Sequence, residues 1–539
     1  MKKLLLAINA KYIHPNVALR LLKANTNYDV DIMEFTIKNH IDTIVDFIIE
    51  GNYKFVGFSC YIWNIEMIKQ ILPLLRNHDI TILLGGPEVS YNAEYYINNN
   101  IADFVIKNEG EEAFDLLLKY LDNKILINEV PNLYHKDGFT FNKLVDISKI
   151  KLPYEYFPVD AKNRIAYIET SRGCPFHCGY CMASLDNKLR FFNIEEIKKN
   201  ILYLQKRNYK IFKFLDRTFN ANKKNFISLI DFIIMHHEDN TSFQFEITGD
   251  LLDDEIINYI NEHAPKNLFR FEIGIQSTNE LANKAVYRIQ NNEKLFHNIR
   301  LIQDAKIIDL HLDLIAGLPY EDYASFIKTF NEVLSLRPKE LQLGFLKLLK
   351  GTKLYEEKEK YGYIFNASAP YDIISNNFIS KEDIEKIHIA EDAFEIYYNS
   401  SKYHNSINYV LNCINNPYEL FFELGKYYPR KLQEKDRYNL FDNMIRNNIN
   451  IDYQEFHKLL ILDYLNVNPY KPSIWWENKV SQKEKANILR HFHQLNMLNH
   501  DLHILYNKSL VIKLEKYIII SIYHQDKKEI NIFENNIYI

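Results

Sequence analysis

The sequence predicts an α/β protein with three parts: a doubly wound parallel sheet, a partial (β/α)6 barrel and a mainly helical carboxyl-terminal domain. In residues 1–125, and again in residues 161–365, short apolar segments of strand length alternate with amphipathic segments of helix length. After residue 365 this alternation stops. The length of 539 residues also requires several domains, because one hydrophobic core rarely grows beyond about 250–300 residues.

The amino-terminal region, residues 1–125, contains five expected strands. They are Lys3–Asn9, Tyr28–Met33, Phe55–Ser59, Thr81–Leu84 and Phe104–Ile106. In a doubly wound (Rossmann-like) sheet, ligands bind beyond the carboxyl ends of the strands. Ser59 and the pair Gly85 and Gly86 fall at that edge, where paired glycines would let the backbone approach a large flat ligand. Glycine is also common in ordinary turns, so the sequence leaves both interpretations open.

Residues 126–160 lack strong periodicity and contain three prolines, which is typical of a linker or an excursion. After this segment the sequence predicts six further strands: Ile165–Glu169, Ile211–Leu215, Phe243–Ile247, Phe269–Ile275, His311–Ile315 and Glu340–Phe345. Helical segments separate them, which predicts a partial barrel of the TIM type over residues 161–365. In such barrels the chemistry collects at the carboxyl ends of the strands. Residues 366–539 form the third predicted domain, to which the sequence assigns no role.

Polar residues gather at the predicted carboxyl ends of the barrel strands. They are Asp216 after the second strand, Glu246 on the third, and Gln276 and Ser277 at the end of the fourth, where Gly274 also lies. Any one of these carboxylates could simply cap a helix or face solvent. Their common location favours a shared site.

Cys174, Cys178 and Cys181 lie within eight residues, spaced C-x3-C-x2-C, in a loop that follows the first barrel strand. Three thiolates can hold three corners of an iron–sulfur cluster and leave one iron open to another ligand. Zinc is the alternative, with His177 as the fourth ligand. Zinc sites usually divide their ligands between two turns, however, and the sequence has no second C-x2-C pair.

The composition excludes several classes of partner. The net charge of −5 gives no evidence for nucleic-acid binding. No segment approaches the roughly 20 apolar residues of a membrane span, and the apolar run after Met1 is too short for a signal peptide. We therefore expect a cytoplasmic protein with no membrane partner, in a compartment where thiolates stay reduced.

The cysteine loop at the start of a barrel resembles that of the radical S-adenosylmethionine (radical SAM) superfamily. The resemblance implies that Cys174, Cys178 and Cys181 bind a 4Fe-4S cluster whose open iron holds S-adenosylmethionine. It also implies that Tyr180 contacts the adenine and that Gly274, Gln276 and Ser277 line the S-adenosylmethionine site, with Asp216 and Glu246 as weaker matches. A ferredoxin or flavodoxin would supply the electron that starts the reaction.

Three features resemble the branch of this superfamily in which a cobalamin-binding domain precedes the barrel. Phe214-Leu-Asp-Arg217 replaces the Gly-Gly-Glu motif of other members, while Ser59, Gly85 and Gly86 take the places that surround the cobalamin tail. Asn108-Glu-Gly-Glu111 resembles a Gly-Glu-Gly-Glu turn common in this branch. The Asp-x-His-x-x-Gly motif that carries a cobalt-ligating histidine is missing. Because His14 could be a displaced ligand or an ordinary loop residue, we expect cobalamin without a protein histidine on cobalt, or no cobalamin.

The implied activity is reductive cleavage of S-adenosylmethionine to a 5′-deoxyadenosyl radical, followed by methylation of an unactivated carbon of an unknown substrate. Two alternatives stay open. One is a radical oxidoreductase or rearrangement enzyme without methyl transfer. The other is a sensor that responds to cobalamin or iron. No signature in the sequence identifies the substrate.

Overall fold

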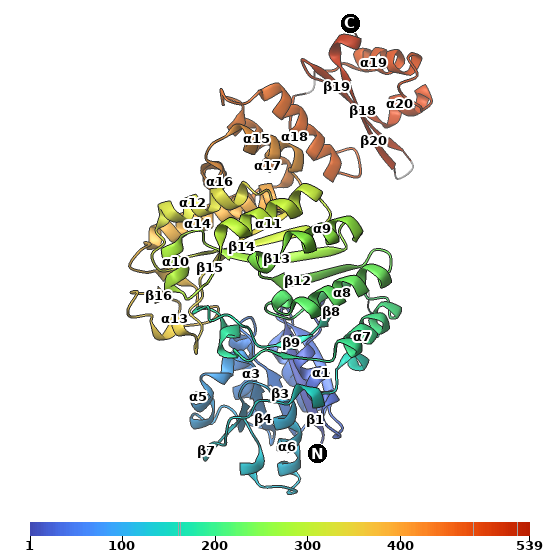
Figure 1. The fold of residues 1–539 in the computed structure, drawn as a ribbon. Coiled ribbons are helices and arrows are strands. Elements are labelled where there is room, and N and C mark those ends of the chain that lie inside the picture. The colour runs from blue at the N-terminus through green and yellow to red at the C-terminus, as the bar shows by residue number, and fades with distance from the viewer. Residues whose placement is uncertain (160, 162, 478, 525–526, 539) are drawn as a thin grey trace. The chain divides into compact units, whose positions relative to one another are not determined.

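The computed structural model describes residues 1–539 apart from 160, 162, 478, 525–526 and 539 (Figure 1). The chain divides into two compact units, one of residues 1–332 and 336–381 and the other of residues 333–335 and 382–539. The first unit contains a doubly wound sheet and a six-stranded parallel sheet, which confirms the predicted fold class. The domain boundaries drawn from the sequence stay predictions.

The first sheet has the strand order β2-β1-β3-β4-β5-β6-β7. Its strands are β1 (Lys3–Asn9), β2 (Asp31–Thr36), β3 (Phe55–Ser59), β4 (Thr81–Gly85), β5 (Phe104–Ile106), β6 (Leu133–His135) and β7 (Gly138–Phe139). The pairs among β1 to β5 are parallel, whereas β6 and β7 add an antiparallel hairpin. The order 2-1-3-4-5 places the switch point, where ligands bind, beyond the ends of β1 and β3.

Both faces of this sheet are buried. Leu4, Leu6 and Ile8 of β1 belong to one apolar core, and the alternate residues Leu5 and Ala7 belong to another. The helices of this part are α1 (Val17–Ala24), α2 (Ile41–Glu50), α3 (Ile65–Leu75), α4 (Pro87–Ser90), α5 (Ala93–Asn98) and α6 (Glu111–Leu121). Helices α2, α3 and α5 supply the first core, and α1 and α6 supply the second. Burial on both sides explains why these strands are continuous apolar runs.

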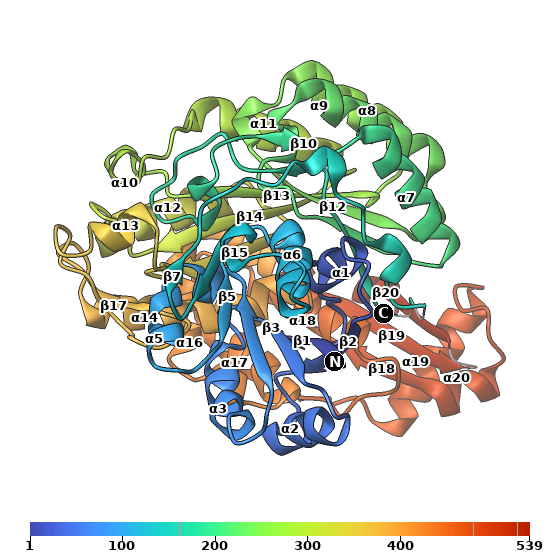
Figure 2. The ribbon, with the colours of Figure 1, turned by 90° about the horizontal axis from the view of Figure 1, so that it is seen from below.

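The second sheet has the order β15-β14-β13-β12-β11-β8, and every neighbouring pair is parallel. Its strands are β8 (Ile165–Ile168), β11 (Ile211–Phe214), β12 (Ser242–Ile247), β13 (Phe269–Gln276), β14 (Asp309–Ala316) and β15 (Glu340–Phe345). The helices that accompany it are α7 (Ile194–Lys206), α8 (Lys223–His236), α9 (Asp254–His263), α10 (Glu280–Ala285), α11 (Asn292–Ala305) and α12 (Tyr323–Leu334). Helices α7, α8, α9 and α11 form an arc along the outer side of this open barrel (Figure 2).

The two faces of the barrel sheet differ in polarity. Phe243, Phe245 and Ile247 of β12 are buried, whereas Gln244 and Glu246 between them are partly exposed. The same alternation along the other strands leaves a set of partly exposed polar side chains: Lys213, Arg270, Glu272 and Asp313. Closed TIM barrels fill their interior with branched apolar residues. Here the inner wall is polar and accessible to a ligand.

Short elements complete the first unit. They are the strands β9 (Ser171–Arg172) and β10 (Arg190–Phe191), helix α13 (Lys353–Glu356), and the pair β16 (Ile364–Phe365) and β17 (Ile373–Ser375). Strands β9 and β10 pair antiparallel at the base of the cysteine loop.

The second unit is mainly helical, as predicted. Its helices are α14 (Lys381–Phe394), α15 (His404–Cys413), α16 (Pro417–Gly425), α17 (Glu434–Ile445), α18 (Tyr453–Val467), α19 (Gln482–Gln494) and α20 (Leu502–Lys508). An antiparallel sheet of β18 (Ser509–Lys513), β19 (Tyr517–His524) and β20 (Lys527–Glu534) follows. Among the described residues, no helix is both long and apolar enough to cross a membrane.

Candidate functional site

The three predicted cluster ligands lie on the loop that follows β8. Cys174 and Cys178 are each 8% exposed, Cys181 is partly exposed, and all three are free thiols. Burial raises the pKa of the Cys181 thiol, and the neighbouring Cys178 and Cys174 raise it further, which shows that the three sulfurs lie within electrostatic reach. His177 on the same loop is exposed.

Asp216, predicted to bind cofactor, makes hydrogen bonds to the start of the cysteine loop. It is 2% exposed, and Oδ1 accepts hydrogen bonds from the hydroxyls of Thr170 at 2.6 Å and Ser171 at 2.5 Å. The backbone N–H of Thr170 donates to Oδ2 at 3.0 Å. Burial raises the pKa of this carboxyl, and the three donors partly counteract that effect. These contacts favour the role of an anchor between β11 and β8.

Arg288 connects the cysteine loop to the end of β13. Its Nη1 donates to the Tyr180 hydroxyl at 3.3 Å and lies 3.9 Å from the Cys178 sulfur, while Nη2 donates to the Gly274 carbonyl. Gln276 follows at a β-bulge with a positive φ of 67°, and its Oε1 is buried without a partner in the described structure. An unpaired amide and a sparsely populated backbone conformation are typical of a ligand site.

Ser277 faces away from this site. It is 0% exposed, and its hydroxyl donates to Oε1 of Glu321 at 2.5 Å. Glu321 also accepts from Thr329 at 3.1 Å, and burial raises its pKa to about 7. Ser277 thus links the end of β13 to the loop after β14, and these contacts favour a structural role.

Glu246 lies on the polar inner wall of the barrel. Its Oε2 is 3.6 Å from Nη1 of Arg217, which directly follows Asp216. Across the same wall, Lys213 Nζ is 3.0 Å from both carboxylate oxygens of Glu272. Burial raises the pKa of Glu246, and Arg217 and Lys213 partly offset the rise. The wall therefore presents both carboxylates and cations to a bound molecule.

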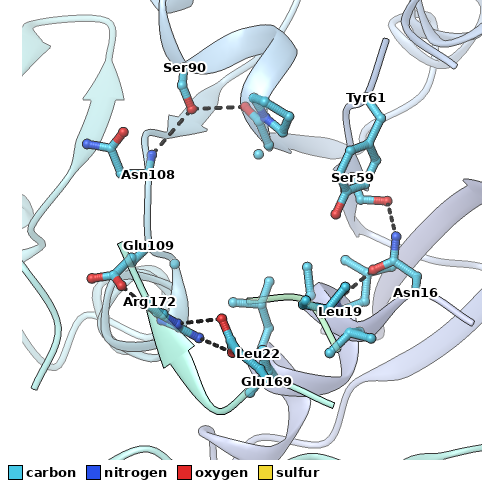
Figure 3. A pocket seen from close by; sticks show the side chains of 18 of the residues that line it. Asn16, Leu19, Leu22, Ser59, Tyr61, Ser90, Asn108, Glu109, Glu169 and Arg172 are labelled. Atoms are coloured by element: carbon cyan, nitrogen blue, oxygen red, sulfur yellow. Dashed lines mark hydrogen bonds and ion pairs between the residues drawn. The ribbon is translucent and has the colours of Figure 1, made fainter. Parts of the chain in front are cut away.

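A cavity of about 1120 Å³ lies between the doubly wound sheet and the cysteine loop (Figure 3). Its volume lies slightly above the roughly 300–1,000 Å³ range of small-molecule sites. Ser59, Gly85 and Gly86 line one side, as the sequence predicted for a ligand at the strand ends, and Arg172 and Met182 line the other. Since Met182 directly follows Cys181, the cavity reaches the cluster loop.

Gly86 shapes this cavity through its backbone. It has a φ of +118°, and a Cβ at this position would lie 2.4 Å from the carbonyl oxygen of Cys60. Only glycine allows the β3 and β4 loops to approach so closely. Ser59 accepts a hydrogen bond from Asn16 at 3.0 Å, which fixes the side chain at the cavity wall (Figure 3).

His14 lines the cavity on the loop after β1. Its Nδ1 is 2.7 Å from the hydroxyl of Tyr167 on β8. Burial lowers the pKa of His14, and the positive charges of Lys11 and Lys213 lower it further, so the imidazole is neutral at pH 7.

A charged network joins the cysteine loop to the doubly wound sheet. Arg172 of β9 donates to Glu169 at 2.9 Å, to Glu109 at 3.1 Å and to Glu111 at 2.6 Å. Arg190 of β10 donates to Glu109 at 2.8 Å and 3.0 Å. Figure 3 shows Arg172 between Glu109 and Glu169 at the edge of the cavity.

The site thus combines a cysteine loop at the carboxyl ends of an open parallel barrel with a doubly wound domain on the other side of a large cavity. Family comparisons agree. Residues 3–118 match the B12 binding domain, residues 168–333 match the radical SAM superfamily, and residues 359–538 match a protein family of unknown function, DUF4080. These matches confirm the predicted resemblance: in this chain a B12-binding domain precedes a radical SAM domain.

Individual relatives are similar over parts of the chain. An uncharacterized methyltransferase, PH0819 of Pyrococcus horikoshii, is 28% identical over 28% of this chain and 37% of its own. The cobalamin-dependent radical SAM methyltransferase TokK of Streptomyces tokunonensis is 22% identical over 60% of this chain and 51% of its own. The chain thus spans about half or less of these two relatives. The solved structure of the cobalamin-dependent radical enzyme OxsB with aqua-cobalamin has a TM-score of 0.60 at 15% identity, over 87% of this chain and 81% of that one.

The residues present fit the cofactors that these families imply. Three thiols on one loop match the ligand set of a cluster with one open iron. Among the described residues, no group of three or more His, Cys, Asp or Glu side chains is placed so that it could hold a metal ion, and His177 is exposed, so the assignment of the three cysteines rests on their spacing and their place in the fold. The cavity of about 1120 Å³ exceeds the usual range of small-molecule sites, and Gly86 lets two strand-end loops approach each other closely at its wall.

Sequence reasoning missed Arg288 and the role of Arg172. Arg172 lies two residues before Cys174, and its position in the cysteine motif was a usable signal. In the structure its side chain is only 11% exposed, and a buried charge of this kind needs partners. Arg288 follows Ser277 by eleven residues with no local pattern, and only the fold brings it to Cys178.

Proposed function

We propose that this protein is a cobalamin-dependent radical SAM enzyme that methylates an unactivated carbon of its substrate. The observation that carries the proposal is the cavity that is bounded by Gly85 and Gly86 on one side and by the neighbours of Cys181 on the other. Reductive cleavage of S-adenosylmethionine at the cluster and methyl transfer from cobalamin are the chemistry that the two cofactors supply when bound. Such chemistry needs both cofactors close to one substrate carbon, and this arrangement provides that proximity.

The protein's own residues bind, orient and shield the reactants. We assign Cys174, Cys178 and Cys181 as cluster ligands, and Arg288 with Tyr180, Gly274 and Gln276 as the wall of the S-adenosylmethionine site. Ser59, Gly85 and Gly86 would hold cobalamin. The polar inner wall would orient a substrate with charged or hydrogen-bonding groups and exclude bulk water around it.

The wider assignments follow from the same proposal. Residues 1–125 would be the cobalamin-binding domain, 126–160 a linker, 161–365 the radical SAM barrel and 366–539 an additional domain. A ferredoxin or flavodoxin would deliver the electron. The enzyme would work in the cytoplasm, where thiols remain reduced.

A single-turnover assay on the anaerobically reconstituted protein tests the activity. We expect an absorbing iron–sulfur centre, bound cobalamin, and formation of both 5′-deoxyadenosine and S-adenosylhomocysteine in the presence of substrate from a cell extract. Cys174→Ala should lose the cluster and both products, while Cys413→Ala, on helix α15 of the second unit, should keep them. 5′-Deoxyadenosine alone would indicate radical chemistry without methylation, and neither product from a reduced cluster would indicate a sensor.

A further inference from the structure

The charged network around Arg172 holds more negative than positive charge. Its carboxylates are Glu109, Glu111, Glu169 and Asp186, and its cations are Arg172 and Arg190, so carboxylates outnumber guanidinium groups by two. Arg172 donates hydrogen bonds to Glu109, Glu111 and Glu169. Arg190 donates hydrogen bonds to Glu109 and Asp186. All four carboxylates line the cavity, as does Arg172.

Glu111 carries an unused acceptor in this network. The residue is 5% exposed, and its Oε1 accepts from Nη2 of Arg172 at 2.6 Å. Its Oε2 is buried and has no hydrogen-bond partner in the described structure. A buried carboxylate oxygen without a donor costs free energy, because its contact with water has been removed and nothing replaces it. A ligand that brings an N–H or O–H group to this point would recover that loss.

The charge of the network decides which ligand group fits. An incoming carboxylate or phosphate would meet more carboxylates than guanidinium groups and would be repelled. A neutral primary amide donates two N–H bonds and carries no charge, so it satisfies Glu111 without adding repulsion. Two cations, Lys188 and Arg217, line the cavity outside this network, and Arg217 is already paired with Glu246.

We propose that the carboxylates Glu109, Glu111 and Glu169 around Arg172 form the site for the neutral amide side chains of the corrin ring. This edge of the cavity therefore selects amidated corrinoids and rejects those with free carboxylates. The inference rests on the proposed function, because it takes a corrinoid as the occupant of the cavity.

The same contact links the corrin to the cluster loop. Arg172 lies two residues before Cys174 and donates to Glu111 at 2.6 Å. An amide bound to Glu111 Oε2 is then connected, through one carboxylate and one guanidinium, to strand β9, which leads into the cysteine loop. Arg172 is thus a positioning residue that sets the corrin edge relative to the loop.

Equilibrium binding to the reconstituted full-length protein tests this selectivity. Cobalamin would be compared with its three monocarboxylates, in each of which one propionamide is hydrolysed, by following the corrin absorbance. We expect at least one monocarboxylate to bind about 10-fold or more weakly than cobalamin, since a bond to a charged acceptor is lost and repulsion is added. Equal affinity for cobalamin and all three acids would overturn the inference, and no binding of any corrinoid would instead refute the proposed function.

Glu111→Gln provides a second test on the protein side. Glutamine has one acceptor oxygen, which Arg172 would occupy, and its amide nitrogen would face the corrin amide as donor against donor. We expect cobalamin to bind about 10-fold more weakly and the preference over the disfavoured monocarboxylate to shrink or reverse, because the glutamine N–H can donate to that carboxylate. The neighbouring Glu112 pairs with Lys143 and does not line the cavity, so Glu112→Gln is the matched control. The affinities of this variant for cobalamin and for the monocarboxylates should equal those of the unmodified protein. Unchanged discrimination in a folded, iron-loaded Glu111→Gln protein would overturn the assignment of Glu111.

Discussion

The substitution Asp216→Asn tests which of two roles Asp216 has. The sequence predicts that Asp216 binds cofactor, whereas its contacts in the structure favour a role as an anchor of the cysteine loop. In the structure, one buried carboxylate accepts three hydrogen bonds from Thr170 and Ser171. Asparagine keeps one acceptor oxygen for the two hydroxyls, and its amide nitrogen would face the N–H of Thr170. One buried donor is then left without a partner, directly before the cysteine loop.

The structure gives the size of the effect. A buried unsatisfied donor costs about 1–3 kcal/mol. Burial raises the pKa of Asp216, so a neutral side chain recovers part of the cost of burying its charge. We therefore expect a net loss of about 1–2 kcal/mol of stability, which lowers the melting temperature by a few degrees at about 2–4 °C per kcal/mol.

Three measurements on anaerobically reconstituted protein separate the roles: melting temperature, iron per chain, and affinity for S-adenosylmethionine in the iron-loaded fraction. An anchor predicts a lower melting temperature and weaker iron retention with unchanged affinity. Asp304→Asn, exposed on helix α11 of the same barrel, is the matched control and should change nothing. A variant that keeps its stability and iron but loses affinity for S-adenosylmethionine would refute the anchor and restore the ligand role.

Other substitutions give further tests. Arg288→Gln removes the buried cation 3.9 Å from the Cys178 sulfur, and we expect a more negative cluster reduction potential in an EPR-monitored titration; an unchanged potential would contradict the contact. Burial raises the pKa of Glu321 to about 7 from its ordinary 4.5, so its stabilising effect is complete below about pH 4.5 and is lost as the pH rises through 7. Glu321→Gln should therefore flatten the fall in melting temperature between pH 5 and 8. Gly86→Ala places a Cβ 2.4 Å from the Cys60 carbonyl oxygen and should weaken cobalamin binding at least 10-fold; normal binding would show that the loop can shift.

The fold could be predicted where burial on both faces leaves a continuous apolar run. Strands β1, β3, β5 and β15 have the bounds expected from the sequence. Strand β2 was expected at Tyr28–Met33 but lies at Asp31–Thr36, because it is a partly exposed edge strand and the apolar Val30 before it is buried outside the sheet. The β6–β7 hairpin was not predicted, although Asp137-Gly138 is a turn signal.

The site could be predicted only to the level of loops. A strand end can be placed from its pattern, but the direction of a single side chain depends on partners far along the chain. Ser277 finds Glu321 forty-four residues later, and Arg288 reaches Cys178 across 110 residues. Such contacts follow from the packing of β13 against β14 and the cysteine loop, which no local pattern contains.

Alternate residues of each barrel strand have different roles: one set packs in the apolar core, and the other forms the polar inner wall. Phe243 and Phe245 hold the sheet beneath its helices, while Gln244 and Glu246 contribute almost nothing to that core. We therefore expect substitutions on the inner wall to change what the barrel accepts while its apolar core stays intact. New substrates could then be reached through a few point mutations that leave the cysteine loop and the cavity beside it unaltered.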